Sequence, residues 1–458
     1  MIKAVSISGF RGFGKTQTIT FSIPDMENEG SGLSIITGSN NSGKTTIIES
    51  IRAFNNRDNP SFSEGKRNIH TGGFVELKLK DEKDEEFRIK TINGGGSSTD
   101  RDGTNTPRGD IYVVPSRRAF SFDFGKSMAG RQHFVYSSSG LQSQRNPTLD
   151  YFADRIFQIE KDKESFDRLL SVALGKEIKW CIEQRDSGSF YLKYVFEDVQ
   201  HSSEGIGDGV WSIFTICAAL YDAPDRSTVV IDEPELSIHP ALQKRIMRIL
   251  LEYSKKIQII VSTHSPYFIN WQAIAQGASL IRVVKEGVDS ICYSIVDDNR
   301  KNIESVLRDL NNPHILGLSA NEAFFLEDNI ILVEGQEDVV IYNKIADKLG
   351  ISISGEFFGW GVGGASKMGF FLSLFKNLGF KKIVAIFDGD KKSEAESLEK
   401  QYAPDYLFLV LKEDDVRDKK EKTLQAKRGI TTEGGELKAE NNEYTRGLFG
   451  KINGYFQK

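Results

Sequence analysis

Cysteine is scarce in this chain of 458 residues, which contains three. Cys181, Cys217 and Cys292 are scattered and form no C-x-x-C pair, so the sequence offers no disulfide framework. Isolated cysteines of this kind are typical of small core residues in a reducing compartment. We therefore expect a cytoplasmic protein.

Long apolar runs and an excess of one charge are also missing. No apolar run approaches the roughly 20 residues of a membrane span, and no charged-then-apolar leader opens the chain. We therefore expect neither membrane insertion nor export. The chain has 59 Lys+Arg against 64 Asp+Glu, a net charge of −5. Because it lacks a strongly basic tail, any surface for nucleic acid must be local. Its length is sufficient for two domains, each with its own core.

Residues 38–45 are the most informative stretch that is present. They match the phosphate-binding pattern G-x-x-x-x-G-K-[ST] at every constrained position. An apolar strand is predicted just before them, at 33–37, and a helix just after them, at 46–54. In that context the backbone N–H groups of the loop wrap phosphates, and the helix N-terminus adds its positive dipole end. The alternative is a chance Gly/Ser loop, and the complete pattern argues against it.

The side chains of this loop predict how a nucleotide is held. Lys44 is expected to reach the β- and γ-phosphates, and Thr45 to offer its hydroxyl to Mg²⁺. The sequence therefore predicts that the chain binds ATP with Mg²⁺. The contacts expected from this loop are Asn40, Asn41, Gly43, Lys44, Thr45 and Thr46.

Two later strand ends supply the partners that such a loop needs. The apolar run 228–231 leads into Asp232, suited to hold Mg²⁺ through its water shell, and Glu233, suited to polarise the attacking water. A second apolar strand, at 257–262, leads into His264, which can sense a γ-phosphate by a hydrogen bond. A buried structural histidine is the alternative, and the position after the Asp-Glu pair favours the sensor.

The order of these motifs carries a resemblance. The P-loop, then I-D-E-P-E-x-x-x-H-P, then S-T-H-S-P resembles the ABC-type ATPase head. Within that class it is similar to the subgroup shared by DNA-repair and chromosome-maintenance ATPases and the overcoming-lysogenization-defect (OLD) nucleases. Residues 7–13 also resemble the N-terminal I-x-x-F-[RK] phrase of that subgroup, which implies that Arg11 lies near the nucleotide.

In such heads a signature segment from another subunit completes the ATP site, which implies a homo-oligomer, at least a dimer. The best candidate is the segment 202–209, in which Ser203 and Gly205 are expected to contact the nucleotide. It departs from the L-S-G-G-Q of transporters, and a plain helix-capping loop is the alternative. The usual glutamine-bearing loop is not evident. Residues 112–118 occupy about its place, with Arg117 a candidate contact to nucleotide or DNA.

A second group of carboxylates follows in the last third of the chain. An apolar strand at 329–333 ends in Glu334, and Asp338 lies four residues further on, near the same face of the strand–helix junction. Another strand, at 382–387, ends in Asp388 and Asp390. Paired carboxylates at the carboxyl ends of parallel strands can share one metal ion or bridge two. The alternative is a pair of solvated strand ends.

Roughly residues 325–420 resemble a Toprim domain. The resemblance rests on a strand followed by E-G, a glycine-rich turn at 361–367 and a second strand followed by D-x-D. The OLD family joins this domain to an ABC-type head. The resemblance implies that Glu334, Asp338, Asp388 and Asp390 bind Mg²⁺ or Mn²⁺ for phosphodiester cleavage. It also implies a further acidic ligand, matched loosely to Asp414 or Asp415, and a lysine matched to Lys419, Lys420 or Lys422.

The expected fold class is α/β, with an ABC-type P-loop ATPase domain followed by a Toprim (Rossmann-like) nuclease domain. Strands at 75–80 and 87–92 are expected to form an antiparallel part of the head. Because no sustained heptads appear, a compact helical insertion is expected in place of a long coiled coil. The expected domains are the head at 1–300 with its insertion at about 145–185, a connecting helical segment at 301–325, the Toprim domain at 326–420 and a C-terminal extension at 421–458.

Two functions of different classes follow from these motifs. The first is an ATP-regulated, metal-dependent DNA endonuclease of the OLD type. The resemblance implies a place in anti-phage defence, beside an accessory protein or a reverse transcriptase with its non-coding RNA. The second is a nucleotide-switched module that binds DNA or a partner and carries a non-catalytic Toprim domain. The intact carboxylates favour the first. A DNA-repair clamp is a weaker third reading, since it leaves the D-x-D domain unexplained.

Overall fold

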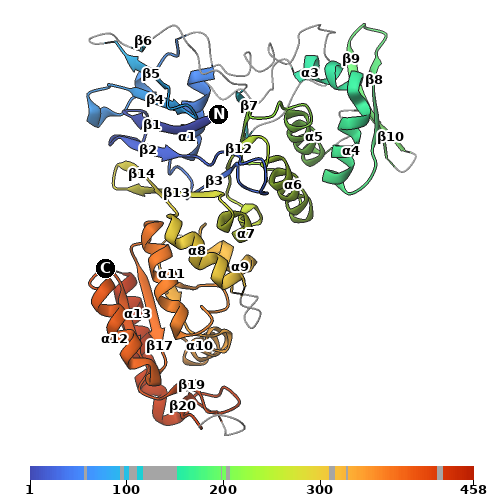
Figure 1. Cartoon of the computed structure of the whole chain (residues 1–458). Coiled ribbons are helices and arrows are strands. Elements are labelled where there is room, and N and C mark those ends of the chain that lie inside the picture. Colours follow the sequence, from blue (N-terminus) through green and yellow to red (C-terminus); the bar gives the residue numbers. More distant parts are fainter. Residues whose placement is uncertain are drawn as a thin grey trace. The chain divides into compact units, whose positions relative to one another are not determined.

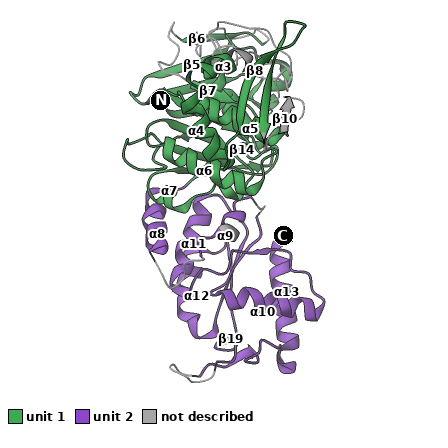
Figure 2. Ribbon diagram, turned by 90° about the vertical axis from the view of Figure 1, so that its right-hand side faces the viewer, with its two compact units in different colours: residues 1–294 green, residues 295–458 purple. Residues whose placement is uncertain are grey.

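The computed structural model divides the chain into two compact units, residues 1–294 and 295–458 (Figure 2). No helix among the described residues is long and apolar enough to cross a membrane. The described residues are 1–55, 59–92, 97–102, 111–116, 152–196, 199–202, 207–308, 315–325, 328–419 and 426–457.

A six-stranded sheet of order β14-β13-β3-β12-β11-β7 forms the centre of the first unit (Figure 1). Its strands are parallel except at the β13–β14 hairpin. Every residue of β3, β12, β11 and β7 is buried, as expected for apolar strands covered on both faces. The carboxyl ends of β3, β11 and β12 therefore lie at one edge of the sheet. The strands are β3 (Leu33–Thr37), β7 (Ile111–Val114), β11 (Thr228–Asp232), β12 (Gln258–Ser262), β13 (Ser279–Glu286) and β14 (Asp289–Ser294).

A five-stranded antiparallel sheet of order β2-β1-β4-β5-β6 packs beside it. Its apolar residues share one core with helix α1 (Lys44–Asn55) and with Ile36, Val230 and Ile260 of the parallel sheet. The strands expected at 75–80 and 87–92 are present, each offset by one residue. The strands are β1 (Ile2–Ser8), β2 (Gln17–Thr20), β4 (Glu76–Asp81), β5 (Glu86–Thr91) and β6 (Thr99–Asp102).

The expected helical insertion contains two helices and also the first strand of a small antiparallel sheet, which the sequence reading did not include. Phe166 of α4 lies edge-on to Trp180 of β8 and to Phe214 of α5, with ring centroids 5.9 and 4.7 Å apart. These aromatic contacts attach the insertion to the rest of the first unit. The elements of this region are α3 (Phe152–Ile159), α4 (Lys163–Leu174), β8 (Lys179–Gln184), β9 (Phe190–Phe196), β10 (Val199–Ser202), α5 (Asp208–Leu220), α6 (Pro240–Tyr253) and α7 (Trp271–Ala275).

The second unit is built on a four-stranded parallel sheet of order β16-β15-β17-β18. A two-stranded parallel pair, β19 and β20, lies in the same unit. Its strands are β15 (Ile330–Leu332), β16 (Glu356–Phe357), β17 (Ile383–Phe387), β18 (Leu407–Val410), β19 (Asp415–Arg417) and β20 (Gly429–Thr431). Its helices are α8 (Asp297–Leu307), α9 (Leu318–Glu322), α10 (Gln336–Leu349), α11 (Ala365–Asn377), α12 (Lys392–Tyr402) and α13 (Asn442–Phe456).

Gln258, at the start of β12, joins the six-stranded sheet to the five-stranded antiparallel sheet. Its fully buried Oε1 accepts from the Ile2 N–H at 2.8 Å and from the Thr228 hydroxyl at 3.0 Å. Its Nε2 donates to the carbonyls of Ile2 at 2.7 Å and Ser22 at 2.8 Å. One side chain therefore satisfies buried polar groups on β1, on β11 and after β2.

We predict that Gln258→Leu lowers the free energy of unfolding of the first unit. The leucine leaves the buried Ile2 N–H and its neighbouring carbonyls without partners, at a cost of about 1–3 kcal/mol for each orphaned group. Urea unfolding followed by tryptophan fluorescence measures the loss. The exposed Gln272 is the matched control, because Gln272→Leu buries no polar group. An unchanged unfolding midpoint in Gln258→Leu would contradict this role.

Candidate nucleotide site and candidate metal site

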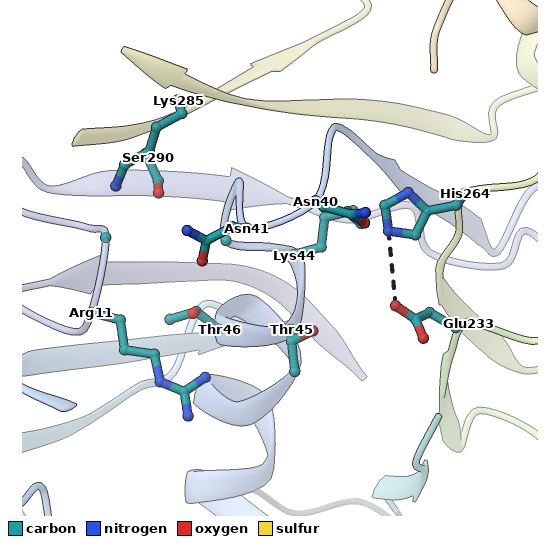
Figure 3. Close-up of a pocket in the computed structure, with 12 residues that line it drawn as sticks. Arg11, Asn40, Asn41, Lys44, Thr45, Thr46, Glu233, His264, Lys285 and Ser290 are labelled. Atoms are coloured by element: carbon teal, nitrogen blue, oxygen red, sulfur yellow. Dashed lines mark ion pairs between the residues drawn. The ribbon is translucent and has the colours of Figure 1, made fainter. Parts of the chain in front are cut away.

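The P-loop lies in a cavity of about 310 Å³ at the carboxyl edge of the parallel sheet (Figure 3). Every P-loop residue expected to contact nucleotide lines it, together with Arg11, Glu233 and His264. Figure 3 shows Glu233 and His264 on one side, the P-loop in the middle, and Arg11, Lys285 and Ser290 on the other side. The other two expected contacts, Ser203 and Gly205, lie outside the described residues, as does Arg117. The cavity is lined by Arg11, Gly12, Asn40, Asn41, Gly43, Lys44, Thr45, Thr46, Glu233, His264, Lys285 and Ser290.

Lys44 is a buried cation at the first turn of α1. Its side chain is 4% exposed, and its Nζ donates to the carbonyls of Gly38 and Ser39, each at 2.9 Å. Burial lowers the pKa of Lys44 to about 8, and the nearby carboxylate of Glu233 opposes that shift. A phosphate would offer this ammonium an anionic acceptor in place of neutral carbonyl groups. The site is therefore built to gain from an anion.

Three side chains at the ends of β11 and β12 are fixed by the strands that carry them. Asp232 is buried and accepts from the Ser262 hydroxyl at 2.9 Å; it does not line the cavity itself. Glu233 follows with a φ of +48°, and its carboxylate lies 3.8 Å from His264 Nε2. Burial lowers the pKa of His264, the Lys44 charge lowers it further, and Glu233 opposes both. A neutral imidazole facing the P-loop suits a hydrogen bond to a terminal phosphate.

Glu235 holds the histidine in place. Its carboxylate accepts from the Thr263 hydroxyl at 2.8 Å and from the His264 N–H at 2.5 Å. Burial raises the pKa of Glu235, while both hydrogen bonds oppose that change. Glu235 therefore connects the turn after β11 to the turn after β12 and fixes the position of the His264 backbone.

The β13–β14 hairpin adds two groups that the sequence reading missed. Ser290 is buried, and its Oγ faces the cavity with no hydrogen-bond partner among the described residues. The Ser290 N–H donates to the Gly12 carbonyl at 2.7 Å. A Cβ at Gly12 would lie 2.4 Å from Ser290 Oγ and 2.9 Å from Lys285 Nζ, so a larger residue there would require both side chains of the hairpin to shift. No local motif marks these residues, because tertiary packing alone brings them to the P-loop.

In the second unit, a cavity of about 360 Å³ gathers Glu334, Asp338 and Asp388 with Asp415, and we call these four the carboxylate cluster. Glu334 and Asp388 follow β15 and β17, Asp338 lies in the first turn of α10, and Asp415 begins β19. Of the two acidic candidates, Asp415 lines this cavity, whereas Asp414 is exposed and does not. The cavity is lined by Glu334, Gly335, Gln336, Glu337, Asp338, Trp360, Gly363, Gly364, Asp388, Asp415, Lys419 and Lys427.

Backbone hydrogen bonds fix the cluster. Asp338 Oδ2 accepts from the Gly335 N–H at 2.8 Å, and Glu334 Oε1 accepts from the Asp388 N–H at 3.0 Å. The glycine turn supports them from the other side. Gly361 has a φ of +82°, and a Cβ there would lie 2.7 Å from the Gly335 carbonyl group. A glycine is therefore required where this turn approaches the end of β15.

Asp390, a predicted metal ligand, does not line this cavity. Its carboxylate lies 2.6 Å from Lys427 Nζ, which is also 3.7 Å from Asp415. Lys419 Nζ lies 2.6 Å from Asp415 on the same site. Of the three lysines named from the sequence, Lys419 reaches the cluster, while Lys420 and Lys422 lie outside the described residues. Lys427 was missed, because nothing in its local sequence distinguishes it.

The cluster holds more negative charge than its surroundings neutralise. Burial, together with the charges of Glu334, Asp338 and Asp415, raises the pKa of Asp388 to about 8, while Lys419 opposes the shift. Burial, together with the charges of Asp415 and Glu334, likewise raises the pKa of Asp338 to about 6. Such shifts mark a site that is stabilised by an added cation.

Carboxylate oxygens are the donors that Mg²⁺ and Mn²⁺ prefer, so the residue types fit either ion. As the side chains are placed, however, no three His, Cys, Asp or Glu residues in the described part of the chain are gathered to hold an ion. Lys419 and Lys427 contact Asp415 and Asp390 instead. Coordination therefore requires these side chains to turn towards an ion.

We predict that metal-free Asp388→Asn melts at a higher temperature than the wild type at pH 8. The pKa of Asp388 is higher in the folded state than the ordinary value of 3.8, so folding takes up a proton between about pH 4 and pH 8. The stability contributed by the protonated group is present at low pH and is lost as the pH rises through about 8. The difference between the two proteins should therefore shrink towards pH 5.

Thermal melts at pH 5 and pH 8, with and without Mg²⁺ or Mn²⁺, measure this effect. Metal should raise the melting temperature of the wild type at pH 8 more than that of Asp388→Asn. The exposed Asp414→Asn serves as the control. If metal-free wild type and Asp388→Asn had the same melting temperature at pH 8, the claim that the Asp388 charge destabilises the fold would be refuted.

Comparison with known protein families gives three matches along the chain. Residues 1–96 match an AAA ATPase domain, and residues 99–270 match an AAA domain described as "putative AbiEii toxin, Type IV TA system". Residues 325–390 match the family "Overcoming lysogenization defect protein-like, TOPRIM domain". The solved structure of an Smc head bound to the C-winged helix domain of ScpA is 16% identical with a TM-score of 0.43, and the match covers 66% of this chain and 99% of that one.

Two curated relatives align over parts of the chain. The chain is 28% identical to the OLD nuclease of Thermus scotoductus over 222 residues, and this alignment covers 44% of this chain and 40% of that protein. The chain is 22% identical to the Septu protein PtuA of Bacillus thuringiensis over 324 residues, and this alignment covers 63% of this chain and 76% of that protein. The chain thus spans less than half the length of the OLD nuclease. The family matches confirm the expected fold class, an ATPase domain followed by a Toprim domain, and the chain is similar to ATPase–Toprim proteins of the OLD family.

Proposed function

We propose that this chain is an ATP-regulated, divalent-metal-dependent DNA endonuclease. The observation that carries the proposal is the carboxylate cluster, in which residues from separate segments meet in one cavity and the pKa values of Asp338 and Asp388 are raised. The same chain holds a complete P-loop cavity in its other unit. Two sites of opposite charge preference, one for phosphate and one for cations, support two linked activities.

In the first unit, we assign ATP binding to the P-loop cavity with Arg11 at its side. Lys44 would neutralise charge on the β- and γ-phosphates, and Thr45, with Asp232 acting through the water shell, would hold Mg²⁺. Glu233 would orient and polarise the attacking water, and His264 would donate a ring N–H to the γ-phosphate. The 3.8 Å separation of Glu233 and His264 allows both to face one terminal phosphate.

The proposed head is completed by a second copy of the chain. Because one head carries one P-loop, the segment with Ser203 and Gly205 would cover the ATP of a neighbouring subunit. A closed dimer is the smallest assembly that satisfies both sites.

In the second unit, Glu334, Asp338, Asp388 and Asp415 are proposed to hold Mg²⁺ or Mn²⁺, with Asp390 joining them on leaving Lys427. The metal supplies Lewis-acid activation of water and of the scissile phosphate. Glu334 is the proposed general base, since burial raises its pKa and Asp388 orients its carboxylate through a backbone N–H. Lys419 and Lys427 are placed to offset phosphate charge once the carboxylates have turned to a cation.

The comparisons support this proposal through the names of the relatives, an OLD nuclease and a Septu protein PtuA. We propose DNA as the substrate and anti-phage defence as the setting, on the resemblance to the OLD family. An accessory defence protein, or a reverse transcriptase with its non-coding RNA, is the proposed partner.

One observation favours a second candidate. Lys419 already pairs with Asp415, and Lys427 with Asp390. Among the described residues, no three His, Cys, Asp or Glu side chains lie close enough together to hold an ion. A nucleotide-switched module that binds DNA or a partner without cutting would keep such ion pairs permanently.

We predict that Lys44→Ala loses ATP binding, because it removes the cation facing the phosphates. Glu233→Gln should bind ATP and hydrolyse it about 100-fold more slowly or worse, since only the water-polarising carboxylate is lost. ATP hydrolysis and light scattering with ATP measure both, and Glu233→Gln should accumulate as a dimer or larger. Wild-type hydrolysis by Glu233→Gln would remove the assigned role, and a monomer with ATP would argue against the shared site.

We predict that Asp388→Ala and Glu334→Ala abolish plasmid nicking while ATP hydrolysis stays near wild type. The loss should exceed about 100-fold, because a metal ion contributes several kcal/mol to stabilising the charged transition state. Plasmid relaxation with Mg²⁺ or Mn²⁺, with and without ATP, is the assay. Asp414→Ala is the matched control. Nicking by Asp388→Ala at the wild-type rate would move the conclusion to the binding module.

A further inference from the structure

Trp360 is a large aromatic side chain left in solvent beside the carboxylate cluster. It is 44% exposed, whereas Trp180, Trp211 and Trp271 are 2%, 6% and 4% exposed. It lines the cavity that contains Glu334, Asp338, Asp388 and Asp415. An aromatic ring at the rim of a phosphate-cleaving site is unexplained by the metal chemistry.

The backbone presents this ring on a fixed turn. Gly359 and Gly361, on either side of it, have φ values of +53° and +82° and form a bridge to each other. The Gly361 N–H donates to the Phe358 carbonyl at 3.1 Å, and the Val362 N–H donates to the Val333 carbonyl at 2.9 Å. The turn is thereby tied to the end of β15, close to Glu334. The exposure of Trp360 is built into the fold.

Trp360 also lines a second cavity, of about 450 Å³. Gln336, Glu337 and Trp360 line both cavities, so the two are neighbours at the start of α10. The lining of the second cavity includes the apolar residues Val340, itself 40% exposed, and Ile341. Trp360 therefore borders both the cavity of the carboxylate cluster and a neighbouring, partly apolar cavity.

Lysines line the two cavities that Trp360 borders. Lys344 is exposed and lines the second cavity, and Lys419 and Lys427 line the cavity of the carboxylate cluster. Arg417 also lines the second cavity, where its Nη2 lies 2.9 Å from Glu337. An exposed aromatic ring with lysines nearby is the combination that binds single-stranded nucleic acid, in which bases stack on rings and phosphates contact Lys or Arg.

We propose that Trp360 stacks on an unpaired nucleobase of the DNA strand whose phosphate lies at the carboxylate cluster. The inference rests on the proposed nuclease function and adds a substrate class to it. Both faces of a base are covered inside a duplex, so a base on Trp360 must be single-stranded or turned out of the helix. The preferred substrate is therefore a strand with unpaired nucleotides next to the cut.

Binding of a single-stranded oligodeoxythymidylate to the full-length chain tests the proposal, beside a strand of the same length with abasic sites. Ca²⁺ replaces Mg²⁺, and a gel shows that the strands stay intact. The wild type should bind the strand with bases more tightly. Trp360→Ala should weaken that binding about 5-fold or more, as loss of a stacked base does, and should bind the abasic strand as the wild type does.

Two further variants separate stacking from simple burial of apolar surface. Trp360→Phe keeps a flat ring and should retain most of the affinity, whereas Trp360→Leu keeps apolar volume without a ring and should behave like Trp360→Ala. Unchanged ATP hydrolysis and melting temperature show that each variant is folded. The fluorescence lost in Trp360→Phe reports the exposed tryptophan, and this signal should be quenched by the oligodeoxythymidylate in the wild type.

Equal affinity of wild type and Trp360→Ala for the strand with bases overturns the proposal, as does failure of the wild type to bind either strand. A blue shift of Trp360 emission with rising protein concentration, without quenching by DNA, would show that a second copy covers the ring, and would also overturn it. Plasmid nicking is scored separately. Nicking that does not depend on Trp360 leaves the nuclease in place, and Trp360-dependent binding without nicking leaves the stacking site in place.

Discussion

Burial of charge at the carboxyl ends of parallel strands is the constraint on which both units depend. In the first unit, Lys44 is almost fully buried, and its pKa falls to about 8. In the second, burial and like charge raise the pKa of Asp388 to about 8. Each group has lost water without gaining a full counter-charge, so each gains most from a ligand of opposite sign. A phosphate relieves Lys44, and a cation relieves the carboxylate cluster.

Buried charges of this kind stay in place only where hydrogen bonds fix the backbone and side chains around them. Glu235 accepts from the Thr263 hydroxyl and the His264 N–H, which fixes the histidine facing the P-loop. In the second unit, the Gly363 and Gly364 N–H groups donate to the Glu334 carbonyl at 2.8 and 2.9 Å. The same glycine turn presents Trp360. One rigid turn thus serves both the proposed metal site and the proposed base-stacking site.

The lysines of the second unit give the carboxylates a resting partner. The Nζ of Lys427 lies 2.6 Å from the Asp390 carboxylate and 3.7 Å from the Asp415 carboxylate. The Nζ of Lys419 lies 2.6 Å from the Asp415 carboxylate. These ion pairs offset part of the repulsion, yet the pKa values of Asp338 and Asp388 remain raised. The offset is therefore incomplete, which leaves a cation competitive with the lysines for these oxygens.

The sequence by itself determined the fold class and most of the side chains at both sites. The P-loop, Asp232-Glu233, His264, Glu334 and Asp388 each follow an apolar strand directly, so a local pattern places them at a sheet edge. Only the tertiary structure showed that Lys285 and Ser290 line the P-loop cavity. It also showed that Asp415 and Lys427 line the cavity of the carboxylate cluster, whereas Asp390 lies outside that lining and pairs with Lys427. The physical reason is that these contacts join segments distant in sequence, whose meeting depends on strand register and packing.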